Sequence, residues 1–200
     1  MKARERHVTA WSRAVLLCLL LTLPIAAGCD GKGGAADGGP LDVVASATFL
    51  ADIAQNVAGD RFTVLALVPA DADLHAFEAT PRDIADVADA DLFIVNGAGL
   101  EQTLEDTVRE AGGGVRVVRA SEGLTTRTPR PGEPQGDAVD PHFWLDPTLV
   151  ETYVENIRAA FAAVDPAGAA TYAENATAYT EELEALDRWI AAQVDTIPPA

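Results

Sequence analysis

Two histidines of this chain stand in segments whose composition favours the binding of a metal ion. His75 lies in the segment DLHAFEATP (73–81), and His142 lies in the segment DPHFWLDP (140–147). Both segments are acidic and bounded by proline, and rigid loops are how a scaffold presents a ligand. Neutral imidazole is the commonest side-chain ligand for zinc and similar ions. We therefore predict that His75 and His142 are metal ligands. The alternative for His75 is an exposed loop histidine, and the alternative for His142 is similar, with its ring packed on Trp144.

Two histidines supply half of a metal site. Zinc in proteins takes four ligands, arranged tetrahedrally, from nitrogen, sulfur or oxygen. Two carboxylates near the histidines, Glu78 and Asp146, are candidates for orienting the imidazole rings by accepting their hydrogen bonds. Glu78 has a second interpretation as a favourable charge before a helix N-terminus. For Glu101, an ordinary acidic residue in a first helical turn is as good an interpretation as a role toward the metal.

The first 28 residues predict export. A basic head precedes an apolar run over 14–27, and this run is shorter than the roughly 20 residues of a membrane-spanning helix. This arrangement is typical of a secretory signal peptide. The exit, AAGC at 26–29, resembles a bacterial lipoprotein processing site, with lipid attached to Cys29. An ordinary secretory signal with a chance cysteine is the alternative.

Charge and cysteine content limit the classes of protein. The leader holds four Lys/Arg residues and one Asp/Glu residue, which leaves 10 basic and 30 acidic residues and a formal charge of −20 in the remainder. Such a surface repels nucleic acid and attracts cations, although a solvated acidic surface explains the charge equally well. Because Cys18 lies in the leader, Cys29 is alone in the mature chain and no intramolecular disulfide can form.

From residue 41 onward the hydrophobic pattern alternates between strand and helix. Strands are predicted over 43–47, 62–68, 92–95 and 115–118. One helix is predicted over an apolar stripe that ends at Gly59, and another over 100–110. Two further helices are predicted to begin at caps, one at Thr80 and one at Asp146. Alternating strands and helices imply an α/β fold, with a parallel sheet covered on both faces. The proline-rich segment 123–139 is predicted to be a mobile surface loop.

A last helix is predicted to begin at Asp165-Pro166 and to be unusually long. Its apolar residues are spaced by three and four, so one seam stays apolar over many turns; they are Tyr172, Ala176, Tyr179, Leu183, Leu186 and Ile190. About 30 residues at 1.5 Å each give a rod of about 45 Å. Such a helix usually belongs to something larger than one small lobe.

Together these motifs resemble the substrate-binding lipoproteins of bacterial zinc, manganese and iron ABC transporters. The matching segments are VAS (44–46), IA (53–54), DLHAFEATP (73–81), NGAGLE (96–101), DPHFWLDP (140–147) and YAENA (172–176). The resemblance implies two α/β lobes bridged by a long rigid helix, with the metal held between the lobes. His75 and His142 are then the two ligands from the first lobe, and the second lobe supplies a His or Glu and an acidic residue.

The resemblance also implies a division of the chain. It consists of a signal peptide (1–28), a lipidated flexible tether (29–41), a Rossmann-like N-terminal metal-binding lobe (42–165) and a long interlobe helix (166–197). The chain ends where the second lobe should begin. We therefore expect that lobe to be absent from this sequence, because the sequence is a fragment or the gene is truncated.

The implied function is that of an extracytoplasmic carrier, facing the periplasm or the cell exterior, which delivers a divalent cation to the permease of an ABC transporter. It would be a lipid-anchored monomer and not an enzyme. Segment 123–139 lacks the histidine-rich stretch of many zinc-scavenging members, so zinc is only slightly favoured over manganese or iron. The deciding ligand would lie in the second lobe, where imidazole favours zinc and carboxylate favours harder ions.

Two other classes of protein are alternatives. A surface adhesin of the same fold would bind its partner whether or not metal is present. A secreted metallohydrolase is disfavoured because the chain has neither an HExxH motif nor a GxSxG elbow.

Overall fold

The computed structural model describes residues 40–74, 77–110, 114–125 and 140–198. All of them belong to one unit of the chain, which spans 38–200. The predicted signal peptide, Cys29 and most of the tether lie outside the described residues, as do His75 itself and most of the predicted loop 123–139. Predictions about those parts stay predictions.

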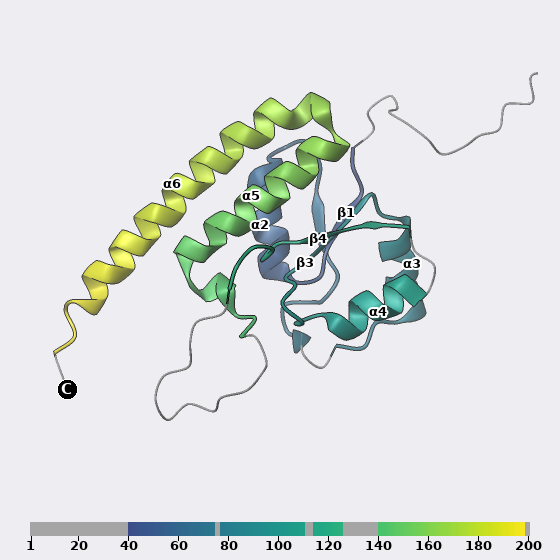
Figure 1. Ribbon diagram of the computed structural model, residues 1–200, viewed down its shortest axis with the longest axis horizontal. Helices are drawn as coiled ribbons and strands as arrows, with labels where there is room; N and C mark the ends of the chain where they lie inside the picture. Colours follow the sequence, from purple (N-terminus) through teal and green to yellow (C-terminus); the bar gives the residue numbers. More distant parts are fainter. Residues whose placement is uncertain (1–39, 75–76, 111–113, 126–139, 199–200) are drawn as a thin grey trace, which may run out of the picture. The chain divides into compact units, whose positions relative to one another are not determined.

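Four parallel strands form the sheet, in the order β2-β1-β3-β4 (Figure 1). They are β1 (Val43–Ala45), β2 (Val64–Ala66), β3 (Leu92–Val95) and β4 (Arg116–Arg119). Val44 of β1 lies opposite Leu65 of β2 on one side and opposite Phe93 of β3 on the other. Each strand coincides with or overlaps a predicted one, and the parallel α/β fold is confirmed.

Alternation of side chains divides the core between the two faces of the sheet. On one face Val43, Ala45 and Ile94 pack against α2 (Thr48–Ala58), α5 (Pro147–Val164) and α6 (Ala169–Val194). On the other face, Val44 and Phe93 pack against α3 (Pro81–Asp89) and α4 (Gln102–Glu110). In Figure 1, α3 and α4 lie on the opposite side of the strands from α5 and α6.

The predicted helix caps are confirmed at both helices that follow a histidine segment. Thr80 and Asp83 form a reciprocal capping box at the start of α3, where Pro81 is the first helical residue. At α5 the carboxylate of Asp146 accepts hydrogen bonds from the backbone N and the Oγ1 of Thr148, at 3.0 and 2.7 Å. A 3₁₀ turn, η2 (Phe143–Leu145), joins His142 to this cap. Local sequence thus determines where both segments end.

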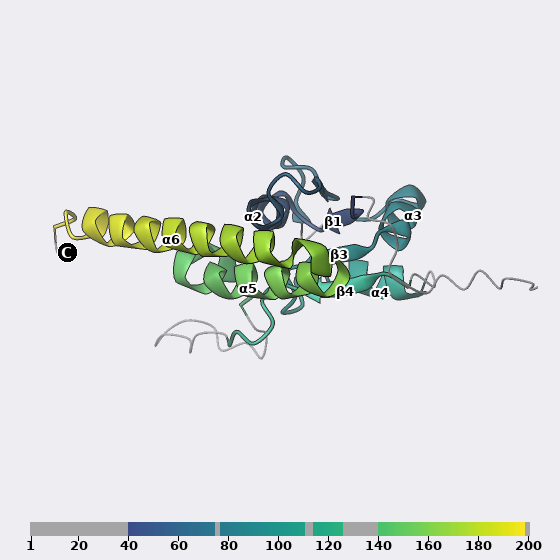
Figure 2. The ribbon, with the colours of Figure 1, turned by 90° about the horizontal axis from the view of Figure 1, so that it is seen from above.

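The long helix α6 follows a short 3₁₀ turn, η3 (Pro166–Gly168). Its predicted seam is buried only in the first part, at Tyr172, Ala176 and Leu183. Beyond that point Leu186 and Ile190 are 44% and 36% exposed. The reason is that α6 continues past the N-terminal end of α5, as the two ribbon views show (Figures 1 and 2). None of the helices in the described ranges is both long and apolar enough to cross a membrane.

An ion-paired cluster joins the start of η3 to the turn after α2. The carboxylate of Asp165 accepts hydrogen bonds from the Tyr172 hydroxyl and from Nη2 of Arg61, each at 2.6 Å, and Nε of Arg61 lies 3.1 Å from the same hydroxyl. The hydrogen bond from Tyr172, followed by that from Arg61, lowers the pKa of Asp165 below its ordinary value. Burial and the bond to Asp165 raise the pKa of Tyr172 to about 12.

Replacing Asp165 with Asn is expected to lower the free energy of unfolding at neutral pH by about 1 kcal/mol. Because the folded pKa of Asp165 lies below the ordinary 3.8, its contribution is complete above that pH and is lost as the pH falls through the folded value. Urea unfolding at several pH values should therefore show the deficit of Asp165→Asn shrinking in acid. The matched control is Asp86→Asn, which removes an exposed pair 3.7 Å long and should change stability by less than about 0.5 kcal/mol. Equal effects of the two variants would contradict the prediction.

Candidate metal site

The connections between strands create a crevice at the carboxyl ends of β1 and β3. The chain leaves β1 through α2 on one face of the sheet and leaves β3 through α4 on the other. The two strands are neighbours, so the topology switches between them. In open α/β sheets, ligands bind outside the carboxyl ends of the strands at such a point.

Both histidine segments reach this end of the sheet. A pocket of about 210 Å³ there has walls that include Thr48, Val68, Leu74 and Trp144. Leu74 directly precedes His75 in the chain, and Trp144 follows His142 by two residues. The two segments, which are about 65 residues apart, therefore border one pocket. The position of the His75 ring lies outside the described residues, so the convergence of the two rings stays a prediction.

The imidazole of His142 has a defined orientation. Its Nδ1 lies 2.8 Å from Oδ1 of Asp140, and its backbone N–H donates to the same oxygen at 3.1 Å. Because a carboxylate only accepts hydrogen bonds, the neutral ring carries its proton on Nδ1 and has its lone pair on Nε2. The ring packs on Trp144 at a centroid distance of 5.1 Å, and Trp144 stacks on Phe49 at 4.3 Å. The side chain of His142 is still 40% exposed.

Asp140, whose role toward the His142 ring was not predicted from the sequence, contacts this ring in the structure. From the sequence, Glu78 and Asp146 were the candidates for orienting the rings. The structure uses the Asp146 carboxylate as the cap of α5, and it places Glu78 on the surface, beside a second pocket of about 210 Å³. Their predicted roles toward the rings stay predictions. A signal for Asp140 was present, because an Asp side chain commonly bonds the backbone two residues on.

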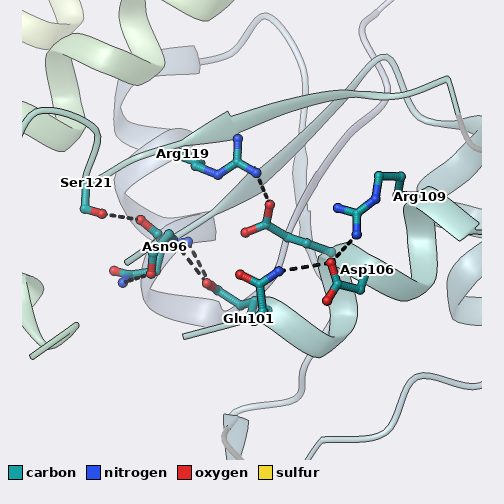
Figure 3. Close-up of polar contacts among 9 residues, drawn as sticks. Asn96, Glu101, Asp106, Arg109, Arg119 and Ser121 are labelled. Carbon is teal, nitrogen blue, oxygen red and sulfur yellow. Dashed lines mark hydrogen bonds and ion pairs between the residues drawn. The ribbon is translucent and has the colours of Figure 1, made fainter. Parts of the chain in front are cut away.

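Glu101, which directly precedes α4, is buried, with only 4% of its surface exposed. Its carboxylate accepts hydrogen bonds from Oγ of Ser46 at 2.7 Å and from the backbone N of Gly97 at 3.1 Å. It also accepts from the backbone N of Asn96 at 2.7 Å (Figure 3). Desolvation raises the pKa of Glu101, while these three hydrogen bonds act in the opposite direction. Glu101 therefore joins the ends of β1 and β3, a role that the first-turn interpretation did not include.

Asn96 extends this polar network to the segment of His142. Its Nδ2 donates to the carbonyls of Gly97 and Pro141 at 3.1 and 3.0 Å, and its Oδ1 accepts a hydrogen bond from the Tyr153 hydroxyl. Its own carbonyl accepts from Oγ of Ser121 at 2.6 Å (Figure 3). Every hydrogen-bonding group of this buried side chain is thus paired, as buried polar groups generally are.

One salt bridge holds α4 against β4 beside this network, and a second lies within α4. Arg119 of β4 pairs with Glu105 of α4, whose side chain is 7% exposed. Arg109 pairs with Asp106 one turn along the helix, as Figure 3 shows. Helix α4, which directly follows Glu101, is therefore fixed to the sheet by charge as well as by its apolar face.

Comparison with known proteins decides the family. The model of the family described as "Zinc-uptake complex component A periplasmic" matches residues 43–200. The chain belongs to this family. The resemblance drawn from the sequence motifs is therefore confirmed.

Relatives within the zinc-uptake component family carry names for three different metals. The manganese-binding lipoprotein MntA of Halalkalibacterium halodurans is 43% identical over 176 residues, which are 87% of this chain and 57% of that protein. The iron-binding protein YfeA of Yersinia pestis is 37% identical over 78% of the chain and 50% of its own length. The zinc uptake protein ZnuA of Bacillus subtilis is 30% identical over 89% and 60%. The chain thus spans 50 to 60% of the length of these relatives.

Solved structures agree with the family fold. A manganese-bound periplasmic metal-binding protein from Candidatus Liberibacter asiaticus superimposes with a TM-score of 0.68 at 30% identity, over 78% of this chain and 58% of that one. A zinc-bound deletion mutant of ZnuA gives 0.74 at 26% identity, over 80% and 60%. Within the described residues of this family member, no three His, Cys, Asp or Glu side chains are grouped closely enough to hold an ion.

Proposed function

We propose that this chain is the first lobe and connecting helix of an extracytoplasmic binding protein that captures a divalent transition-metal ion and passes it to an ABC permease. The observation that carries the proposal is His142, held by Asp140 so that Nε2 has the lone pair, on a segment that borders the same pocket as the residue before His75. His75 and His142 would each give one nitrogen to the ion. The remaining ligands would come from the second lobe.

The Asp140–His142 pair suits a reversible carrier. A ligating histidine commonly donates its other ring N–H to a carboxylate, which fixes the tautomer and makes the metal-binding nitrogen more basic. Two neutral imidazoles form a site that an incoming second lobe can complete and an opening motion can dismantle. The ion is cargo in this scheme, and the chain carries out no chemical step on it.

An exposed apolar stripe on α6 supports a two-lobed protein. Trp189 and Val194 in the last part of α6 are 60% and 55% exposed, and Leu186 and Ile190 of the same helix are also partly exposed. Ile197, which follows the helix, is 67% exposed. The chain spans 57% and 50% of the length of two of its relatives. We propose that a second lobe packs on this stripe, which would remove these side chains from water.

The cellular location belongs to the same proposal. Residues 1–28 would act as a signal peptide, and Cys29 would carry the lipid anchor, as in a relative named a manganese-binding lipoprotein. The protein would act as a monomer at the outer face of the membrane. Zinc is the ion slightly favoured, although the names of relatives include manganese and iron as well.

The test is metal titration of the complete gene product, including the sequence downstream of residue 200. We expect zinc, manganese or ferrous iron to raise the melting temperature, since an ion at 100 times its Kd stabilises the folded state by about 2.7 kcal/mol. Magnesium is the control, because it prefers oxygen ligands and retains its water. No rise with any of the three transition metals would contradict the proposal. Turnover of ester or peptide substrates by the same sample would instead indicate a hydrolase.

A further inference from the structure

A buried chain of hydrogen bonds ends at the peptide group that carries His142. The Tyr153 hydroxyl donates to Oδ1 of Asn96, and Nδ2 of Asn96 donates to the carbonyl of Pro141 at 3.0 Å. Tyr153 and Asn96 are both 0% exposed. The three residues come from α5, from the end of β3 and from the His142 segment, so the chain connects parts of the sequence that are 45 and 57 residues apart.

The direction of these hydrogen bonds is fully determined. The carbonyls of Gly97 and Pro141 can only accept, so the NH₂ group of Asn96 must face them. Its Oδ1 then faces Tyr153, whose hydroxyl must be the donor. Desolvation, followed by the charge of Glu101, raises the pKa of Tyr153, so this hydroxyl keeps its proton. A flipped carboxamide would place two acceptors opposite each other at Pro141.

The peptide between Pro141 and His142 is held on both sides. Its carbonyl accepts from Asn96, and its N–H donates to Oδ1 of Asp140. A peptide group is planar, so two hydrogen bonds from opposite edges fix the direction in which the chain enters His142. Asp140 then holds the ring through Nδ1. Asp140 belongs to the same segment as His142, whereas Asn96 belongs to the sheet.

We infer that Asn96 and Tyr153 are positioning residues for His142, which fix its backbone to β3 and α5 so that the imidazole lies where the ion binds. This inference rests on the proposed function in its second half only. Its first half concerns the orientation of His142 in the metal-free protein. The sheet and α5, and not the segment 140–147 alone, then determine the placement of the ligand.

The chain offers a matched pair of variants. Tyr153→Phe and Ser121→Ala each delete one hydroxyl that donates to Asn96, the first to its side chain and the second to its backbone carbonyl. Both residues are buried. Only the first change releases the carboxamide that holds Pro141. A general loosening of the Asn96 turn would therefore affect both variants, and a specific effect on His142 would appear in one.

The experiment compares the two variants in the complete gene product. In the metal-free protein, NMR of the imidazole Cε1–H groups reports each ring, and the variants His75→Gln and His142→Gln assign the two signals that are compared. We expect Tyr153→Phe to move and broaden the His142 signal and to leave that of His75 in place. We also expect its affinity for zinc or manganese to fall about 10-fold, as is usual for a group that orients a metal ligand. Ser121→Ala should lower the melting temperature without either effect.

Two results would overturn the inference: an unmoved His142 signal in Tyr153→Phe, or equal movement of that signal in both variants. If the unmodified protein binds no transition metal, the proposed function fails, and the comparison of the ring signals still decides whether Asn96 and Tyr153 position His142.

Discussion

Replacing His142 with Ala in the complete gene product should weaken the binding of zinc or manganese by more than about 100-fold, a larger loss than groups that merely orient a ligand produce. The change removes one of the two nitrogens that the first lobe supplies, and no other described side chain at the crevice offers an imidazole. His75→Ala should produce a loss of the same order. Isothermal calorimetry, or competition with a chelating dye, measures the affinity.

Two further variants sharpen this prediction. Asp140→Asn keeps the ring but removes the carboxylate that accepts from Nδ1 at 2.8 Å, so we expect a smaller loss of about 10- to 100-fold. Asp60→Asn changes an exposed residue in the turn after α2, at the opposite end of the sheet, and should leave the affinity unchanged. Unaltered affinity in both histidine variants would refute the assignment of the ligands.

The second large effect concerns stability. Replacing Glu101 with Ala should lower the free energy of unfolding by about 3 kcal/mol or more, because removing the acceptor leaves buried donors without partners. The donors are Oγ of Ser46 and the backbone N–H groups of Asn96 and Gly97. Urea unfolding followed by circular dichroism provides the measurement. The control is Glu110→Ala, an exposed position at the end of α4, the helix that follows Glu101, which should change stability by less than about 0.5 kcal/mol. Similar losses in the two variants would show that the network contributes little.

The same carboxyl group predicts a pH dependence. Burial raises the pKa of Glu101 above the ordinary 4.5, so the folded protein keeps this proton at pH values where the unfolded chain has released it. The contribution of Glu101 to stability is therefore complete below about pH 4.5 and is lost as the pH rises through the folded value. The stability of the unmodified protein relative to Glu101→Gln, which cannot titrate, should decrease as the pH rises from 4 to 7. A difference that stays constant or grows would contradict this.

Local rules explain why much of the fold could be predicted. The caps at Thr80 and Asp146 depend on residues within three positions of each other, and proline at the next position reinforces both. The strand 92–95 is four consecutive apolar residues, as expected for a strand buried on both faces. The seam of α6 was predicted from its spacing, but its second half is exposed. Periodicity shows which residues share a face of a helix and does not show whether anything covers that face.

The candidate site was predictable in part. Residue type and a stiff, proline-bounded setting were enough to select His75 and His142. Asp140 bonds a residue two positions away, so its role could have been predicted from local geometry. Glu101 could not be distinguished from an ordinary first-turn acid, because its partner Ser46 is 55 positions away. Tyr153 lies on the buried face of α5, and nothing local in the sequence indicates that its hydroxyl reaches Asn96.

By itself, the sequence determined the α/β class, the helix starts and the two segments that present histidine, since each depends on hydrophobic period, capping and proline within a few residues. Only the tertiary structure decided that these segments border one pocket at the switch between β1 and β3, and that a buried network reaches the peptide before His142. The physical reason is that desolvation makes an unpaired buried polar group expensive. Glu101, Asn96 and Tyr153 can therefore be buried only where the fold brings their distant partners to them.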